Sequence, residues 1–323
     1  GFDGIIITGR SDKLCGIEIK DNDIHISDAS HLKGRKTGDV HSHLKGKGST
    51  AVIGPAGENG VLFSSIIIDG HFAAGRSGIG LTFASKNLKY ITIQGAGKTN
   101  VFNPKDLRSA REDVFRLTAA SPILLGKFGI SRFGTGALYD LMDARRMMPT
   151  KNFRKTQFDQ AFKLNAHAFK KKFKPKNTGC RGCHILCKKI TKDQTSIPEF
   201  ETMSHFSALL GNTDIGTVVK ANRICNEMGM DTISAAATLA CFSEISKKKL
   251  SPKEIVSLLM DIGKKKGLGV ELGQGAATYA GNCGRSDLAM VVKGQELPAY
   301  DPRGAYGMAL AYATSSRGGC HLR

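Results

Sequence analysis

Apolar and polar positions alternate in the first third of the chain. Residues 17–19 and 24–26 each place two isoleucines around one polar residue, and Asp21-Asn22-Asp23 separates the two runs. A period of two on both sides of a polar turn predicts a β-hairpin. Further strands are predicted at 51–53, 64–68 and 90–93, and residues 1–9 are predicted to form a strand already under way at the first residue.

The pattern becomes helical after about residue 105. Apolar residues between Asp214 and Met228 recur at helical spacing, and Asp214 and Asp231 are predicted to cap consecutive helices. Residues 251–254 have the spacing of a capping box, with proline at the first helical position. Because strands and helices do not alternate regularly, the predicted fold class is α+β, a β-rich part followed by α-helical parts, rather than a doubly wound sheet.

The chain is strongly basic. Its 323 residues include 47 basic and 28 acidic ones, a formal net charge of +19. The densest basic run covers 170–176, and shorter runs lie at 188–189, 247–249 and 264–266. Such a field attracts anions, which could be nucleic acid, a phosphorylated cofactor, an anionic cluster or an acidic protein. The last two runs also fit ordinary helix ends.

Three of the eight cysteines, Cys180, Cys183 and Cys187, fall within eight residues. Without a secretory signal, this group favours metal binding over a disulfide framework and predicts a cytoplasmic location. A 4Fe–4S cluster would need a distant fourth ligand. Zinc, with His184 as a further ligand, is the alternative. The spacing favours the cluster, because zinc ribbons usually carry a second Cys-x-x-Cys pair and this chain has none.

Several other segments stand in a fixed order along nearly the whole chain. They cover residues 28–31, 53–59, 69–71, 74–78, 85–89, 198–201, 229–234, 296–304 and 317–321. Together with the cysteine spacing, these segments resemble the tungsten-pterin aldehyde:ferredoxin oxidoreductase family. The chain resembles a central fragment of such a protein, without its N-terminal part and much of its C-terminal domain.

The resemblance implies three regions. Residues 1–105 would be the C-terminal part of the β-rich pterin-binding domain, 106–290 an α-helical domain that carries the cluster cysteines, and 291–323 the truncated start of a second α-helical domain. It implies a tungsten (or molybdenum) bis-pterin beside a 4Fe–4S cluster, which oxidises an aldehyde to a carboxylic acid and passes electrons to ferredoxin. The fourth cluster ligand would lie outside the chain, and the isolated fragment would be inactive.

The resemblance also assigns roles to single residues. Glu201 would act as a base on attacking water, and His321 would orient or protonate the carbonyl oxygen. The cysteine group would supply three cluster ligands. The residues implied in cofactor binding are Arg76 and Gly78 in a glycine-flanked loop, Asp231, Asp301 and Arg303. Ordinary alternatives are a helix-start glutamate for Glu201, a surface position for His321, a helix cap for Asp231 and a simple turn at Asp301.

Two other functions compete with this one. A basic nucleic-acid-binding protein with a zinc centre would use the positive charge, but aromatic residues make up only 7% of the chain and no nucleic-acid-binding module is evident. A non-catalytic iron–sulfur electron-transfer subunit would not need Glu201 and His321. The implied partners are ferredoxin and a small aldehyde, with no membrane; a homo-oligomer is left open.

Overall fold

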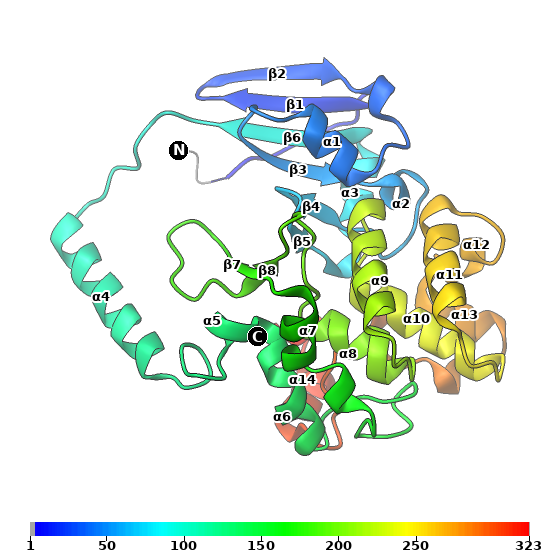
Figure 1. Cartoon of the computed structure of the whole chain (residues 1–323). Coiled ribbons are helices and arrows are strands. Elements are labelled where there is room, and N and C mark those ends of the chain that lie inside the picture. The colour runs from blue at the N-terminus through cyan, green and yellow to red at the C-terminus, as the bar shows by residue number, and fades with distance from the viewer. Residues whose placement is uncertain (1–3, 323) are drawn as a thin grey trace.

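A six-stranded sheet forms one end of the molecule (Figure 1), in a computed structural model that describes residues 4–322. Its strands lie in the order β2-β1-β6-β3-β4-β5. β1 and β6 are parallel, and the other neighbours are antiparallel. The strand bounds are Cys15–Lys20 (β1), Asp23–Asp28 (β2), Ser49–Ile53 (β3), Ile66–Ile68 (β4), Phe72–Ala74 (β5) and Leu88–Gln94 (β6).

The predicted hairpin is confirmed, with Ile17 opposite Ile26 and Ile19 opposite Ile24. The strand predicted at the first residues is wrong for the described part, because residues 4–14 belong to no strand, and residues 1–3 lie outside the described residues. Ile6 is 93% exposed. An apolar run forms a strand only where a neighbouring strand pairs with it, and none lies beside this segment.

Short helices and turns connect the strands of this sheet along the chain. They are α1 (Thr37–His43), α2 (Pro55–Glu58) and α3 (Gly80–Ser85), with 3₁₀ turns η1 (Ser30–Leu32) and η2 (Arg76–Gly78). Val40 and Leu44 at α1 pack in a small core with Val52 of β3 and Tyr90 of β6. The sheet therefore buries one apolar face under α1.

The rest of the chain is mainly helical, so the α+β class is confirmed. Its longer helices are α4 (Pro104–Ala120), α9 (Ile215–Met228), α10 (Thr232–Ile245) and α11 (Pro252–Lys264). The shorter ones are α5 (Ile130–Phe133), η3 (Thr135–Leu138), α6 (Tyr139–Ala144), η4 (Ala161–Lys163), α7 (Ala166–Phe173), α8 (Phe200–Ser204), the π-helix η5 (His205–Leu209), α12 (Gly269–Leu272), α13 (Gly275–Asn282), η6 (Ser286–Leu288) and α14 (Tyr306–Thr314). Two small hairpins pair β7 (Lys176–Thr178) with β8 (Lys188–Ile190), and β9 (Val291–Val292) with β10 (Gln295–Glu296).

The predicted helix starts are confirmed. Asp214 accepts hydrogen bonds from the first turn of α9, Asp231 does so for α10, and Ser251 with Glu254 forms the capping box of α11. The main core runs from Ala56 to Tyr312 and so draws on all three predicted regions. The proposed division at 105 and 290 therefore stays a prediction. Within residues 4–322, each helix is too short or too polar to pass through a bilayer.

The sheet and the helices meet through direct backbone contact. Ser65 N donates to Gly229 O (2.8 Å), and Asp231 N donates to Phe63 O (2.9 Å). A Cβ added at Gly54 would lie 2.2 Å from Met228 O, a backbone atom that cannot rotate away. This close approach fixes the turn between α9 and α10 against the sheet, which places Arg76 opposite Asp231.

Gly54→Ala tests this contact. The added methyl has to push two backbones apart, so we expect the free energy of unfolding to fall by about 2–3 kcal/mol in urea titrations. Gly38→Ala in α1 is the matched control, because its Cβ would meet nothing within 4 Å. Equal stability of the two variants would show that the backbone contact is not tight.

Candidate functional site

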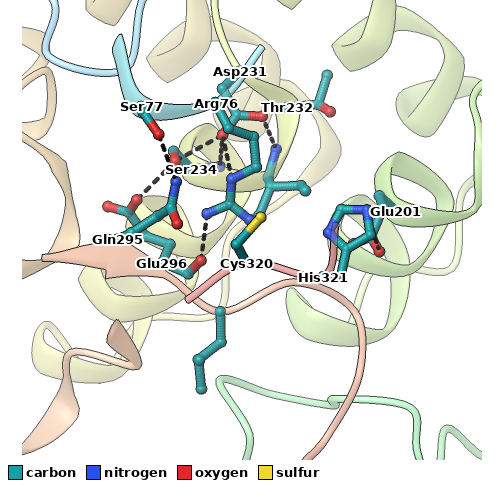
Figure 2. Close-up of polar contacts among 12 residues, drawn as sticks. Arg76, Ser77, Glu201, Asp231, Thr232, Ser234, Gln295, Glu296, Cys320 and His321 are labelled. Atoms are coloured by element: carbon teal, nitrogen blue, oxygen red, sulfur yellow. Dashed lines mark hydrogen bonds and ion pairs between the residues drawn. The ribbon is translucent and has the colours of Figure 1, made fainter. Parts of the chain in front are cut away.

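Arg76 is buried in the turn η2, between β5 and α3. Its Nη2 donates to the backbone oxygen of Glu296, and its Nε lies 3.6 Å from Asp231 Oδ2 (Figure 2). Nε and Nη1 are buried and have no hydrogen-bond partner within the described residues. Because a buried cationic donor without an acceptor is costly, this guanidinium is suited to a further anionic group.

Gly78 closes the same turn. Its φ is +65°, and a Cβ there would lie 2.2 Å from Leu62 O. Only glycine fits this combination without strain. Glycine is thus required at position 78 by the turn that directs the Arg76 side chain inward. A contact of Gly78 with a cofactor stays a prediction.

Asp231 both caps a helix and belongs to a buried polar network. Its carboxylate accepts from the backbone N–H groups of Ile233 and Ser234. The Ser234 hydroxyl lies 2.8 Å from Asp231 Oδ2 and 2.7 Å from Glu296 Oε2. One hydroxyl has one proton, so it can donate to only one of the two carboxyl groups. Burial raises the pKa of Glu296 above its usual value, against the opposing hydrogen bonds from Ser234 and Ala276 N.

Glu201 and His321 meet beside this network. Glu201 lies in the first turn of α8, and its Oε2 accepts from Ala299 N (2.7 Å). Its Oε1 is 3.7 Å from His321 Nε2. Figure 2 shows the two side chains next to each other. Both Glu201 Oε1 and His321 Nδ1 are buried without a hydrogen-bond partner in the described part of the chain. The described chain therefore leaves two buried polar atoms of this pair without a hydrogen bond.

Burial controls the protonation of this pair. It raises the pKa of Glu201 to about 7, against the opposing hydrogen bond from Ala299. Burial, helped by the Arg76 charge, lowers the pKa of His321 to about 4. At neutral pH His321 is thus uncharged, and Glu201 is divided between its acid and its carboxylate. The raised pKa of Glu201 and the lowered pKa of His321 both favour the uncharged forms of these side chains. The contact is therefore an acid–base pair rather than a salt bridge.

His205 lies one turn after Glu201, in the π-helix η5. It is fully buried, and its Nε2 is 3.2 Å from Leu297 O. Burial lowers the pKa of His205 to about 4, so the ring is neutral and Nε2 is the donor. Glu201 and His205 therefore hold the same short segment, Glu201 through Ala299 N and His205 through Leu297 O.

Sequence reasoning did not single out Ser234, Glu296 or His205. Ser234 has a weak signal, because it stands three residues after the capping Asp231. Glu296 and His205 have none, since their positions follow from tertiary contacts with residues far along the chain.

Asp301 and Arg303 bind each other. Arg303 Nε and Nη2 donate to the two oxygens of the buried Asp301 (2.9 and 2.6 Å), and Nη2 also donates to Phe153 O. Asp301 N donates to Met147 O. These contacts stabilise the turn after the segment held by Glu201. The role of Asp301 and Arg303 in binding the cofactor stays a prediction.

The three clustered cysteines lie in the loop between β7 and β8. Cys180 is exposed, Cys183 and Cys187 are half-buried, and Cys183 N donates to Cys180 O (3.1 Å). Within residues 4–322, no three His, Cys, Asp or Glu side chains are grouped so that they could hold a metal ion. The cysteine site therefore stays a prediction. His184, the alternative zinc ligand, faces α4, where its Nε2 is 2.6 Å from Thr118 Oγ1.

Comparisons with known proteins agree over the whole chain. A family model described as "Aldehyde ferredoxin oxidoreductase, domains 2 & 3" matches residues 110–323, and one described as the N-terminal domain of the same family matches residues 1–95. The tungsten-containing aldehyde ferredoxin oxidoreductases of Pyrococcus furiosus and Thermococcus kodakarensis are 36% and 35% identical to this chain. The alignments cover 100% of the chain and 57% of each relative, so the chain spans little more than half their length.

Two more distant matches were found. The aliphatic sulfonate oxidoreductase, WOR-like subunit, of Pyrococcus furiosus is 26% identical over 99% of the chain and 58% of the relative. The active-site complex BamBC of benzoyl coenzyme A reductase, solved with 1,5-dienoyl-CoA, superposes with a TM-score of 0.77. That match covers 90% of this chain and 49% of the solved one at 22% identity, so it supports the fold alone.

Glu201→Gln tests the electrostatics of the site without any cofactor. A carboxyl whose pKa rises on folding stabilises the protein fully below its unfolded pKa of 4.5, and that contribution is lost as pH rises through about 7. Glutamine keeps an acceptor for Ala299 N but never ionises. We expect the variant to be more stable than wild type by about 3 kcal/mol at pH 8 and by under about 1 kcal/mol at pH 5.

Urea unfolding at the two pH values measures this difference. Glu199→Gln is the control, because Glu199 is partly exposed and pairs with Lys188. A stability gain for Glu201→Gln that does not change between pH 5 and pH 8 would mean that Glu201 has an ordinary pKa.

Proposed function

This chain belongs to the aldehyde ferredoxin oxidoreductase family, and we propose that it takes part in oxidising an aldehyde to a carboxylic acid, with electrons leaving through a 4Fe–4S cluster to ferredoxin. The observation that carries the proposal is the pair Glu201 and His321, 3.7 Å apart with unpartnered buried atoms on both side chains. The reaction takes one aldehyde and one water to a carboxylate, three protons and two electrons. It therefore needs proton acceptors at the site and an electron acceptor nearby.

The chain's own residues suit the proton steps. With a pKa of about 7, Glu201 is partly ionised at neutral pH and can take a proton from attacking water or from the aldehyde hydrate. Neutral His321 has one ring nitrogen within reach of Glu201 and the other, Nδ1, unpartnered. It can orient the carbonyl oxygen of the substrate through one of them. Tyr300, whose ring lies 5.8 Å from that of His321, lines the same place.

A tungsten bis-pterin, the group implied by the family resemblance, would fit the residues around Arg76. Nη1 of Arg76, which has no hydrogen bond, and Nε, which has only the 3.6 Å contact with Asp231, could donate to an anionic oxygen such as that of a pterin phosphate. Asp231 fits less well, because its two oxygens already accept hydrogen bonds from α10. When bound, the metal supplies the acceptor for the two electrons.

The cysteine loop fits the cluster better than it fits zinc. Cys180, Cys183 and Cys187 supply soft sulfur ligands in one loop, as iron–sulfur clusters need. His184, the nearest nitrogen ligand for zinc, is engaged with Thr118 and packs its ring 4.9 Å from that of Phe115. A fourth ligand has to come from outside this trio.

Aldehyde-dependent reduction of a viologen dye by the metal-loaded protein tests the activity. We expect Glu201→Gln to lower kcat by about 10²–10⁴-fold, the usual size of a general-base contribution. In wild type, kcat/KM should fall as pH drops through about 7, because protonation removes the base. Glu199→Gln should keep both the rate and the pH profile. The test uses the whole protein that contains this chain, because the chain spans only 57% of its relatives. If that protein, loaded with metal, oxidises no aldehyde, the proposal is refuted.

Iron analysis with electron paramagnetic resonance of the reduced protein tests the cluster. Cys183→Ser should lose most of the iron and the cluster signal. The control is Cys283→Ser, since Cys283 is also a free cysteine but is exposed and lies at the end of α13, outside the cysteine loop. Zinc in place of iron in wild type, or an unchanged iron content in Cys183→Ser, would contradict the assignment.

A further inference from the structure

Six basic side chains gather around the cysteine loop, and we call this surface the basic face. Five of them are exposed and Lys170 is partly buried. They come from the end of α5, the last turn of α7 with the residue after it, the start of β7, and the loop itself. The basic face consists of Arg132, Lys170, Lys171, Lys174, Lys176 and Arg181.

Direct contacts join these elements into one surface. Lys170 Nζ lies 4.6 Å from the centre of the Phe133 ring, which ties α7 to α5. Lys189 Nζ donates to Leu186 O (2.7 Å) in the cysteine loop and lies 3.4 Å from Ile130 O at the start of α5. β7 and β8 form a hairpin whose far end is the cysteine loop, as Figure 1 shows. The six charges therefore lie on the cysteine loop itself and on the elements next to the base of its hairpin.

The basic face is not neutralised by the protein. None of its six residues forms an ion pair with any residue between 4 and 322, whereas basic residues elsewhere do, such as Lys36 with Glu227 and Arg154 with Glu244. Glu199, which follows the hairpin in the chain, is paired with Lys188 of β8. In α4, whose Phe115 contacts the loop through His184, Asp113 is paired with Arg116. Uncompensated charge of one sign steers an oppositely charged partner towards it.

We propose that the basic face is the docking site for a small acidic electron-carrier protein of the ferredoxin class. The inference rests on the proposed function, because it assumes that the cysteine loop holds a redox cluster. Cys180 is the exposed member of the three cysteines, so a carrier bound over the basic face is next to the loop. Each docking event moves one electron from this cluster to the oxidised carrier, and two carriers are reduced for each aldehyde oxidised.

The same charge could bind nucleic acid, but the position favours a protein carrier. The aromatic ring within the face, Phe133, is covered by Lys170 Nζ and so is not free to stack on a base. The charges also surround the predicted redox loop, and a nucleic acid would have no use for electrons delivered there.

Charge reversal tests the docking site. We expect Lys171→Glu/Lys174→Glu, in the metal-loaded protein, to raise KM for a purified acidic bacterial ferredoxin about tenfold at low salt, since paired rim charges act mainly on association. The difference should disappear at high salt through screening. The rate with a viologen dye, which needs no docking, should stay unchanged. Lys249→Glu/Lys253→Glu is the control with the same charge change, on exposed residues without ion pairs in the described chain.

Calorimetric binding of the oxidised ferredoxin gives a second measurement that does not depend on turnover. It should show the same weakening of Kd in the first variant and none in the control. Equal loss in both variants would mean that only net charge matters, which overturns the docking site. The docking site would also be overturned if wild type bound poly(U) RNA but no ferredoxin, and if the Lys171→Glu/Lys174→Glu variant lost the RNA binding. If the dye assay fails in wild type while ferredoxin binding behaves as expected, the proposed activity is wrong and the docking site stands.

Discussion

The buried charge of Arg76 is the constraint around which the site is organised. The guanidinium cannot release its proton, so the fold has to surround it with acceptors or leave it at a cost. Two acceptors come from distant parts of the chain, the backbone oxygen of Glu296 and, at longer range, the Asp231 carboxylate. Meeting this demand requires the sheet to be held against the α9–α10 turn, which the backbone contacts at Gly54 and Gly229 achieve. Nη1 still lacks an acceptor, and Nε has only the longer contact with Asp231, which is why we propose that an anionic group binds there.

The same charge sets the balance at Glu201 and His321. Burial pushes both groups towards their neutral forms, while Arg76 favours ionised Glu201 and opposes protonated His321. Asp231 acts in the opposite direction on each. At Glu201 the hydrogen bond from Ala299 N, followed by the Arg76 charge, opposes burial, so its pKa is raised only to about 7. The acid–base pair is thus tuned by residues that also hold the framework together.

Local signals in the sequence were sufficient for the helix starts and the first hairpin. Asp214, Asp231 and Ser251 bond to amides two or three residues away, and the isoleucines of β1 and β2 pair across a two-residue turn. Residues 4–14 show the limit of such signals, because an apolar run cannot reveal whether a partner strand exists. The meeting of Glu201 with His321 could not be derived from spacing, and only the family resemblance indicated it. Glu296 and His205 were missed because tertiary contacts alone give them their roles.

The structure separates the two kinds of chemistry that the proposed reaction needs. The proton-handling groups are buried, where low polarity shifts pKa values and strengthens each charge interaction. The cysteine loop projects from the helical part and is surrounded by unpaired cations. Burying that loop as deeply as Glu201 would protect a cluster but also prevent a protein carrier from reaching it. The connection between the two places is short in sequence, because the segment after β8 runs directly into α8, which carries Glu201. One continuous stretch of chain thus joins the predicted electron exit to the predicted base.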